Sequence, residues 1–186
     1  RSDNGQSDSG LTTAFDQPGL TLGTYGYLPT DIRHNLKVFG SYKIADWFTL
    51  GANVIAQSPR HYGCIGRVPS RIDRFAGAYG AAGFFCNVVN GQIVTDPAAG
   101  SGTPSQSNLR LTPRGSVFAG DWLTQTNLTM AFTLPAELYK ATLRVDVFNL
   151  FAEKARIDFQ ENGTQNNGNP RGDYRYPSSY QAPRSI

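Results

Sequence analysis

The chain has 186 residues, carries a formal net charge of +3 and contains 17% charged and 12% aromatic residues. A charged fraction of about 25% is usual in soluble domains, so this chain is poor in charge. The basic residues form no run of the kind that marks a nucleic-acid-binding surface. No stretch approaches the roughly 18 consecutive apolar residues of a transmembrane helix. A nucleic-acid-binding protein and a helical membrane protein are therefore both disfavoured.

Residues 1–30 are rich in polar and turn-forming residues and predict a loop, with a short strand over residues 20–25 as an option. Apolar and polar residues then alternate over residues 33–44 and again over residues 47–57. A period of two places successive residues on opposite faces of a β-strand. Because only Ala45-Asp46-Trp47 joins the two stretches, they predict an antiparallel hairpin.

The tract 59–115 shows no sustained alternation and predicts a long loop, in which residues 72–87 favour a short helix or a hairpin. The tract contains Cys64 and Cys86, which are 22 residues apart. Without a C-x-x-C pair or a nearby pair of histidines, this spacing disfavours a metal site. A single disulfide formed in an oxidising compartment is favoured, and two free thiols are the alternative.

Alternation returns over residues 118–134, and residues 139–159 predict another long strand after a short turn at Pro135-Ala136-Glu137. The stretch 139–159 is unusual because it contains no glycine or proline. Residues 161–183 predict a second polar loop, and Arg184-Ser185-Ile186 predict the start of a final strand whose remainder is missing. Neighbouring strands are expected to pair in antiparallel fashion.

Ordinary strands contain about 5–6 residues, whereas a tilted strand that crosses a bilayer needs roughly 9–11. The long strands, short turns and long loops therefore predict an all-β fold. The expected fold is a fragment of an antiparallel transmembrane β-barrel with about four long strands, short periplasmic turns and long extracellular loops. Aromatic residues beside the turns suit an interfacial girdle, and these are Tyr42, Trp47, Phe48, Phe132 and Tyr139. A soluble sandwich is the alternative, in which the same apolar face would be the core.

The alternation also predicts which side chains share a face. In a barrel the apolar set points outward to lipid, and the polar set points to the concave, lumen side. The apolar set is Leu36, Val38, Tyr42, Leu50, Val54, Leu128, Met130, Val145 and Val147. The polar set is Lys37, Asn53, Asn127, Arg144 and Asp146. We expect Arg144, Asp146 and Lys140 to pair with neighbouring strands or a plug and not to hold substrate.

Three motifs and the two loop cysteines resemble the C-terminal β-barrel region of TonB-dependent outer-membrane receptors, in particular the Oar-like subgroup. The motifs are Asp31-Ile32-Arg33-His34-Asn35-Leu36-Lys37, Val145-Asp146-Val147-Phe148-Asn149-Leu150-Phe151 and Ser179-Tyr180-Gln181-Ala182-Pro183-Arg184. The resemblance implies a barrel of about 22 strands with an N-terminal plug. Residues 1–186 would then be a partial C-terminal portion of that barrel, with the plug domain and the final strand absent.

The resemblance implies a receptor and transporter in the cell outer membrane of a Gram-negative bacterium, which binds and imports a scarce ligand such as a siderophore, carbohydrate or peptide. Its partners would be outer-membrane lipid and the TonB complex, the latter reached through the missing N-terminal part, with no nucleic acid. The alternative function is a soluble secreted β-rich binding or adhesion module. The tripeptide Arg171-Gly172-Asp173 matches an adhesion sequence, although three residues in a loop match by chance often.

The sequence offers no enzyme site. No Ser/His/Asp arrangement or carboxylate pair stands out, and an outer-membrane hydrolase would need such a constellation. His34 and His61 lie far apart without partners at ligand spacing, so no metal site and no cofactor are expected. The loops 59–115 and 161–183 are equally suited to contact a ligand and to pack over a barrel mouth. Individual ligand-binding residues stay unknown, and the site residues are the disulfide candidates Cys64 and Cys86.

Overall fold

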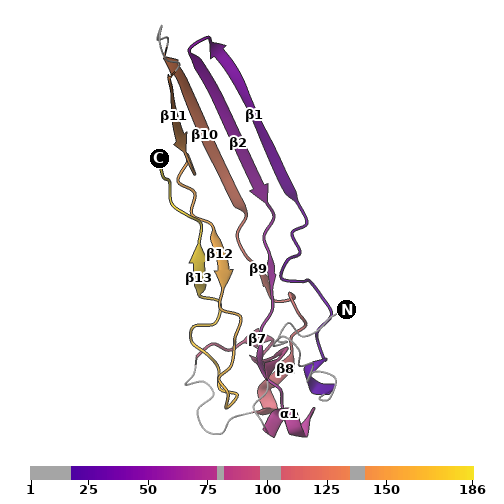
Figure 1. Cartoon of the computed structure of the whole chain (residues 1–186). Helices are drawn as coiled ribbons and strands as arrows, with labels where there is room; N and C mark the ends of the chain where they lie inside the picture. The colour runs from indigo at the N-terminus through magenta and orange to yellow at the C-terminus, as the bar shows by residue number, and fades with distance from the viewer. Residues whose placement is uncertain (1–17, 79–81, 97–105, 135–140) are drawn as a thin grey trace. The chain divides into compact units, whose positions relative to one another are not determined.

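The computed structural model describes residues 18–78, 82–96, 106–134 and 141–186, which are mainly antiparallel β-structure (Figure 1). The chain divides into two compact units made of alternating segments. We call Arg1–Asp31, Arg60–Gly120 and Asp158–Ser178 the disulfide unit. We call Ile32–Pro59, Asp121–Ile157 and Ser179–Ile186 the sheet unit. Within the described ranges, no helix has the length and apolar character needed to span a membrane.

The sheet unit contains a four-stranded antiparallel sheet in the order β1-β2-β10-β11 (Figure 1). The strands are β1 (Asn35–Ala45), β2 (Phe48–Gln57), β10 (Leu123–Leu134) and β11 (Ala141–Val147). Only Asp46 and Trp47 separate β1 from β2, and the register shifts between Lys43 and Ala45. The predicted hairpin and the antiparallel pairing of neighbouring strands are confirmed.

The register places the predicted apolar residues of all four strands on one face, although Phe39 and Ile55 lie on the other. Directly opposed residues share a face of an antiparallel sheet, and Val38 is opposite Val54, which is opposite Thr126. Leu50 is opposite Met130, which is opposite Val145. We call this side the apolar face. The other side carries the predicted polar set, since Lys37 shares it with Asn53, Asn127, Arg144 and Asp146. The predicted division of the side chains between two faces is therefore confirmed.

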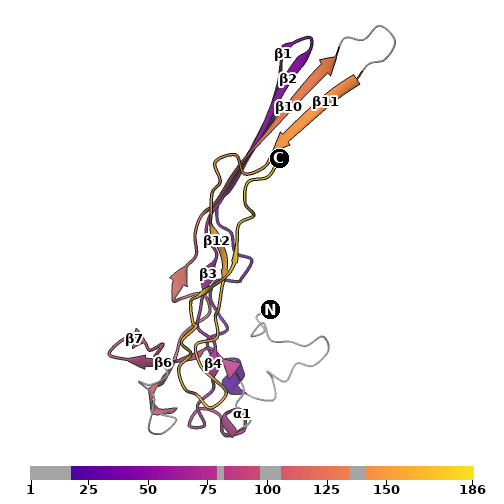
Figure 2. The ribbon, with the colours of Figure 1, turned by 90° about the vertical axis from the view of Figure 1, so that its left-hand side faces the viewer.

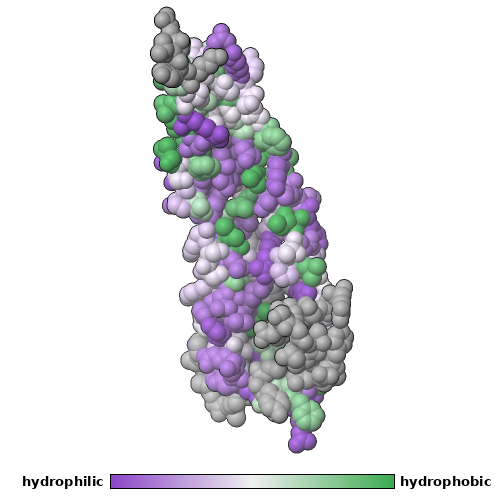
Figure 3. Space-filling view, viewed as in Figure 1, coloured by the Kyte–Doolittle hydropathy of each residue, from purple (hydrophilic) through white to green (hydrophobic). Residues whose placement is uncertain are grey.

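The four strands form a single layer (Figure 2), and much of the apolar face is exposed. Leu36, Val38 and Leu143 are 59%, 55% and 58% exposed, whereas Val147 at the end of β11 is buried. Figure 3 shows hydrophobic side chains at the surface of the strands beside hydrophilic ones. An exposed apolar surface of this extent normally marks a face that another partner or a membrane covers.

The strand predicted over residues 139–159 is wrong as one continuous element. β11 ends at Val147, and the next strand, β12, spans Arg156–Phe159. Between them, Asn149 and Ala152 have φ angles of 50° and 54°, in the left-handed region that no strand residue adopts. Residues 148–155 contain no glycine or proline and are mostly compatible with a strand, which is why the break was not predicted, although Asn149 falls on the apolar parity.

The strand predicted over residues 118–134 is also divided. β9 (Phe118–Ala119) pairs with β3 (His61–Tyr62), and β10 begins only at Leu123. Gly120 lies at this break, where its N–H donates to the carbonyl of Arg60 at 3.0 Å and a Cβ would lie 3.1 Å from the Tyr62 ring. The predicted turn at residues 135–137 falls outside the described residues, as do Tyr139 and Lys140.

Three short segments differ from the structure that their sequence predicted. Residues 20–25 do not form a strand, because Pro18–Leu20 is a 3-10 turn (η1) and Gly23 has a φ of 76°. The second predicted loop contains β13 (Pro177–Tyr180), which forms a two-stranded sheet with β12. Instead of starting a strand, Ser185 makes an isolated antiparallel bridge to Phe148.

The disulfide unit contains short elements around a small core. β4 (Gly66–Arg67) pairs with β5 (Ala82–Gly83), and β6 (Phe85–Val89) lies between β7 (Gln92–Ile93) and β8 (Leu109–Leu111). The helices are α1 (Arg74–Ala78) and a 3-10 turn, η3 (Gln106–Asn108). α1 lies in the stretch where a short helix or hairpin was predicted. One core cluster contains Leu20, Val68, Ala76 and Phe85, and a second contains the two cysteines and Tyr174.

Candidate functional site

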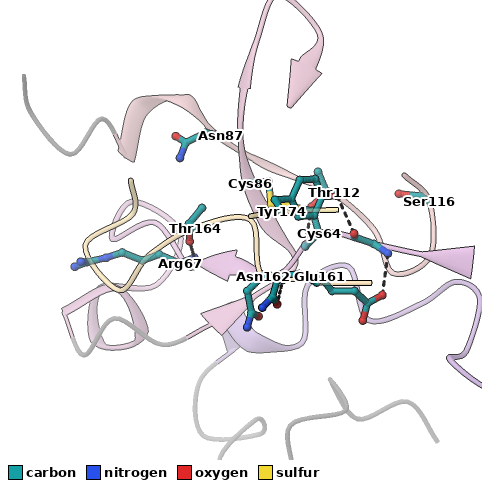
Figure 4. The surroundings of a disulfide bond; sticks show 12 residues. Cys64, Arg67, Cys86, Asn87, Thr112, Ser116, Glu161, Asn162, Thr164 and Tyr174 are labelled. Carbon is teal, nitrogen blue, oxygen red and sulfur yellow. Dashed lines mark hydrogen bonds between the residues drawn. A yellow bond between two sulfur atoms is a disulfide. The ribbon is translucent and has the colours of Figure 1, made fainter. Parts of the chain in front are cut away.

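Cys64 and Cys86 are at bonding distance in the middle of the disulfide unit, with their Cα atoms 6.1 Å apart. Both side chains are fully buried. Figure 4 shows the residues that surround them. Tyr174 packs on the pair, and its hydroxyl donates a hydrogen bond to the carbonyl of Gly63 at 2.9 Å. Burial raises the pKa of the Tyr174 hydroxyl, so this group stays a neutral donor at physiological pH. The cysteine pair thus joins two parts of the first predicted loop, and Tyr174 of the second predicted loop packs on it.

The segment around Gly163 lies directly against the two sulfur atoms. A Cβ on Gly163 would overlap the sulfur of Cys64 and would approach that of Cys86 to 2.7 Å, so only glycine fits. Backbone hydrogen bonds hold the segment on both sides: Ile65 donates to the carbonyl of Glu161 at 2.8 Å, and Gly163 donates to that of Ile65 at 2.7 Å. The segment covers one side of the bonded pair.

A charged group lies next to this segment. The Arg60 guanidinium contacts Asp158 at 3.0 Å and Glu161 at 3.1 Å, and its central carbon lies 4.5 Å from the centroid of the Tyr62 ring. The second carboxylate oxygen of Glu161 accepts the N–H of Gly63 at 3.3 Å. Burial raises the pKa of Tyr62 to about 12. These contacts with Arg60 and Gly63 occupy both carboxylate oxygens of Glu161. The buried Nε of Arg60 has no hydrogen-bond partner among the described residues.

A cavity of about 320 Å³ opens beside this charged group, and we call it the aromatic pocket. Tyr27, His61 and Phe84 supply its rings, and Arg60, Arg114 and Glu161 supply its charges. The Tyr27 and His61 rings stack with centroids 4.3 Å apart. The sequence pointed only to the loops 59–115 and 161–183 as wholes, which were as suited to packing as to ligand contact. Tyr27, Leu28 and Pro29 lie outside both loops, and no sequence spacing indicated this group of residues.

A second, open depression of about 440 Å³ is lined by Gln165, Asn166, Asn167 and Arg171. Arg171 makes two hydrogen bonds to Asp173, at 2.8 and 2.6 Å. This contact lowers the pKa of Asp173 and raises that of Arg171. The adhesion-like tripeptide therefore pairs its own two charges.

The other residues that the sequence analysis singled out, Arg144, Asp146 and His34, lie in the sheet unit. Arg144 pairs with Asp146 at 2.8 Å, and Asp146 also accepts the hydroxyl of Thr129 at 2.5 Å. His34 stacks on Trp122 with ring centroids 6.5 Å apart. In the described part of the chain, no three side chains of the His, Cys, Asp or Glu type form a group that could hold a metal ion.

Two kinds of residues were beyond sequence reasoning. Gly163 and Tyr174 contact the disulfide from more than 70 residues away along the chain, and the pocket joins five separate segments. Such long-range contacts leave no periodic signal.

No family model, no curated protein and no solved structure matches this chain.

Proposed function

We propose that the chain is part of a TonB-dependent receptor of the Gram-negative outer membrane, in which the four-stranded sheet is a section of a transmembrane β-barrel. The observation that carries the proposal is the apolar face, which is continuous across four strands, exposed along β1 and half-buried along most of β10. Lipid would cover this face, and the polar face would line a water-filled or plugged lumen. The three sequence motifs support the assignment to this class of receptor.

The length of the apolar face suits a bilayer. From Trp122 to Phe132 the chain advances about 33 Å, at about 3.3 Å per residue. At a tilt of about 40°, this corresponds to about 25 Å along the membrane normal, which is the usual height of the apolar band of such barrels. A soluble sandwich strand does not need this length.

Aromatic side chains mark both ends of the apolar face. At the end that contains the β1–β2 turn, the rings of Trp47, Phe48 and Phe132 stack, with Trp47–Phe48 centroids 5.7 Å apart. At the other end, His34 and Trp122 flank the continuation of β2 and stack on each other. Aromatic rings at two levels along a strand resemble the two interfacial girdles of a membrane barrel.

The edges of the sheet supply a further argument. β1 and β11 are its edge strands among the described residues. Edge strands of this length invite pairing with other strands and would favour aggregation if left open. Neighbouring barrel strands in the complete receptor would pair with both edges. The import of a scarce ligand would depend on a plug and the TonB complex, which act through other parts of the receptor.

Lipid contact is the property to test. Both native tryptophans, Trp47 and Trp122, are replaced by phenylalanine, and one tryptophan is introduced at Val54 or, as the matched control, at its neighbour Asn53. Each protein is reconstituted in vesicles whose acyl chains carry bromine, which quenches tryptophan fluorescence on contact. We expect strong quenching for Val54→Trp and little for Asn53→Trp. Equal quenching of the two, or a chain that stays soluble and monomeric without detergent, would support the secreted module instead.

A further inference from the structure

One continuous segment, Asp158–Ser178, covers the cysteine pair, and we call it the strap. Neither cysteine has any exposed surface. Gly163 of the strap lies so close to the two sulfur atoms that a Cβ would overlap that of Cys64, and Tyr174 of the strap packs on the pair. No external reagent can therefore reach either sulfur atom while the strap is in place.

The strap is held by contacts to the segments of both cysteines. Figure 4 shows Glu161, Thr164 and Tyr174 of the strap near the pair. Next to the first cysteine, the carbonyl of Gly63 accepts the Tyr174 hydroxyl at 2.9 Å. Next to the second, Asn87 donates its side-chain N–H to the carbonyl of Gly168 at 2.7 Å. Such contacts are reversible, so the strap can open while the covalent bond beneath it stays intact.

Forming the bond needs space that the closed strap does not leave. Two cysteine thiols lose two electrons and two protons, and an oxidant disulfide takes them up and becomes two thiols. One cysteine thiolate first attacks the oxidant, which gives a mixed disulfide and releases one oxidant thiol. The other cysteine thiolate then displaces the second oxidant thiol. The mixed disulfide adds a bulky group to a sulfur atom beside Gly163, where even a methyl group does not fit.

We propose that the bond between Cys64 and Cys86 forms first, by exchange with a disulfide-bearing oxidant, and that the strap closes over it afterwards. Two separate thiols need more room than a bonded pair of sulfur atoms, so the strap closes poorly over the reduced cysteines. Reduction, in turn, requires the strap to open. Every residue of this argument belongs to the disulfide unit. The proposal consequently goes beyond membrane transport and holds equally if the sheet does not contact lipid.

Amide hydrogen exchange tests the order of the two events on the complete 186-residue chain in one detergent, either oxidised or kept reduced by dithiothreitol. The probe is the N–H of Gly163, which donates to the carbonyl of Ile65 at 2.7 Å. The control lies in the same unit outside the strap, and is the N–H of Arg114, which donates to the carbonyl of Gly23 at 2.9 Å. We expect reduction to accelerate exchange at Gly163 at least about tenfold and to leave Arg114 unchanged. Retained protection of Gly163 in the reduced chain, or an equal loss at both amides, would overturn the proposal.

Two tyrosine variants test whether the strap controls access to the bond. Tyr174→Phe removes the hydrogen bond to Gly63 and keeps the ring. Tyr176→Phe makes the same chemical change in the strap at a residue that is 65% exposed, which makes it the matched control. We expect dithiothreitol to reduce the bond about three- to tenfold faster in Tyr174→Phe and at the wild-type rate in Tyr176→Phe. Equal rates in the two variants would show that the strap does not limit reduction.

The urea dependence of the reduction rate distinguishes an opening strap from unfolding of the whole unit. A local opening exposes little surface, whereas complete unfolding exposes all of it. We expect the logarithm of the reduction rate in dilute urea to rise much less steeply than the equilibrium constant for unfolding does. Equal slopes would show that the sulfur atoms are reached only through complete unfolding, and the strap would then have no separate role.

Discussion

Phe48 lies directly opposite Phe132 in the pairing of β2 with β10, and their rings stack with centroids 4.9 Å apart. The pair joins the two hairpins of the sheet unit, because Phe48 begins β2 and Phe132 is also opposite Leu143 of β11. Trp47 stacks on both rings. One end of the apolar face is thus held by aromatic contacts between strands that are far apart in the sequence.

The coupling between these two rings is measurable. Phe48→Leu, Phe132→Leu and the double variant form a double-mutant cycle on the free energy of unfolding, measured by urea titration in one detergent. Stacked aromatic pairs contribute about 0.5–1.5 kcal/mol beyond their buried area, and we expect a coupling energy of that size. Phe39 lies on the opposite face and is 82% exposed, so the cycle of Phe39 with Phe132 should show no coupling. Additive single changes at Phe48 and Phe132 would contradict the prediction.

The two faces of the sheet should tolerate arginine very differently if lipid covers the apolar face. Val145 is opposite Met130 on that face, and Val145→Arg near the bilayer midplane should cost about 2–4 kcal/mol of stability in vesicles. Thr142, opposite Thr133 on the polar face of the same strand, is the control, and Thr142→Arg should cost little. The comparison uses unfolding of the complete receptor in lipid. A similar cost at both positions would argue against a lipid-covered face.

The alternation of apolar and polar residues predicted most of the four-stranded sheet. A period of two is set by the backbone itself, so the four strands of the sheet and the partition of their side chains could be predicted before any contact was known. The break after Val147 could not, because Leu150 and Phe151 are as compatible with a strand as their neighbours. The aromatic pocket could not be predicted either. It joins Tyr27, Arg60 and Glu161, whose separation in the sequence exceeds any local pattern.

Asn149 explains why the chain leaves the sheet after Val147. Its side chain is 2% exposed, donates to the carbonyls of Glu153 and Ala182 at 2.9 Å each, and accepts the N–H of Glu153 at 2.9 Å. Asn149→Ala leaves these groups without partners and keeps a side chain in the left-handed region, so we expect a loss of at least about 2 kcal/mol in unfolding free energy.

A glycine at the same position separates the two causes. Asn149→Gly removes the same hydrogen bonds but adopts the left-handed conformation without steric cost, and should recover about 1 kcal/mol relative to alanine. Exposed Asn162 is the control residue, and Asn162→Ala should have little effect. Equal stability of the alanine and glycine variants would show that backbone conformation contributes nothing at this turn.

Gly163 should be among the least replaceable residues of the disulfide unit. A methyl group there would overlap the sulfur atoms of the bonded cysteines, and the backbone on both sides is held by hydrogen bonds. Gly163→Ala is expected to cost about 1–3 kcal/mol, as overpacking of a core does, and to make the bond more easily reduced by dithiothreitol. Gly40→Ala is the control, since nothing lies within 4 Å of its Cβ position. Wild-type stability and reduction rate for Gly163→Ala would refute the close contact.

The contact between Asp121 and Arg156 in the sheet unit should be sensitive to acid. Hydrogen bonds from the Arg156 side chain, at 2.8 and 2.7 Å, and from its backbone N–H at 3.0 Å lower the pKa of Asp121 to about 2. An unfolded aspartate has a pKa of about 3.9. Because the folded pKa is the lower one, the contact stabilises the fold fully above about pH 4 and loses this contribution as the pH falls towards about 2. Amide hydrogen exchange at Arg156, corrected for its intrinsic rate, should therefore accelerate over that interval. Asp121→Asn lacks the titrating group and should show fast corrected exchange with no such step. A step of equal size in both proteins would assign the acid sensitivity to another carboxylate.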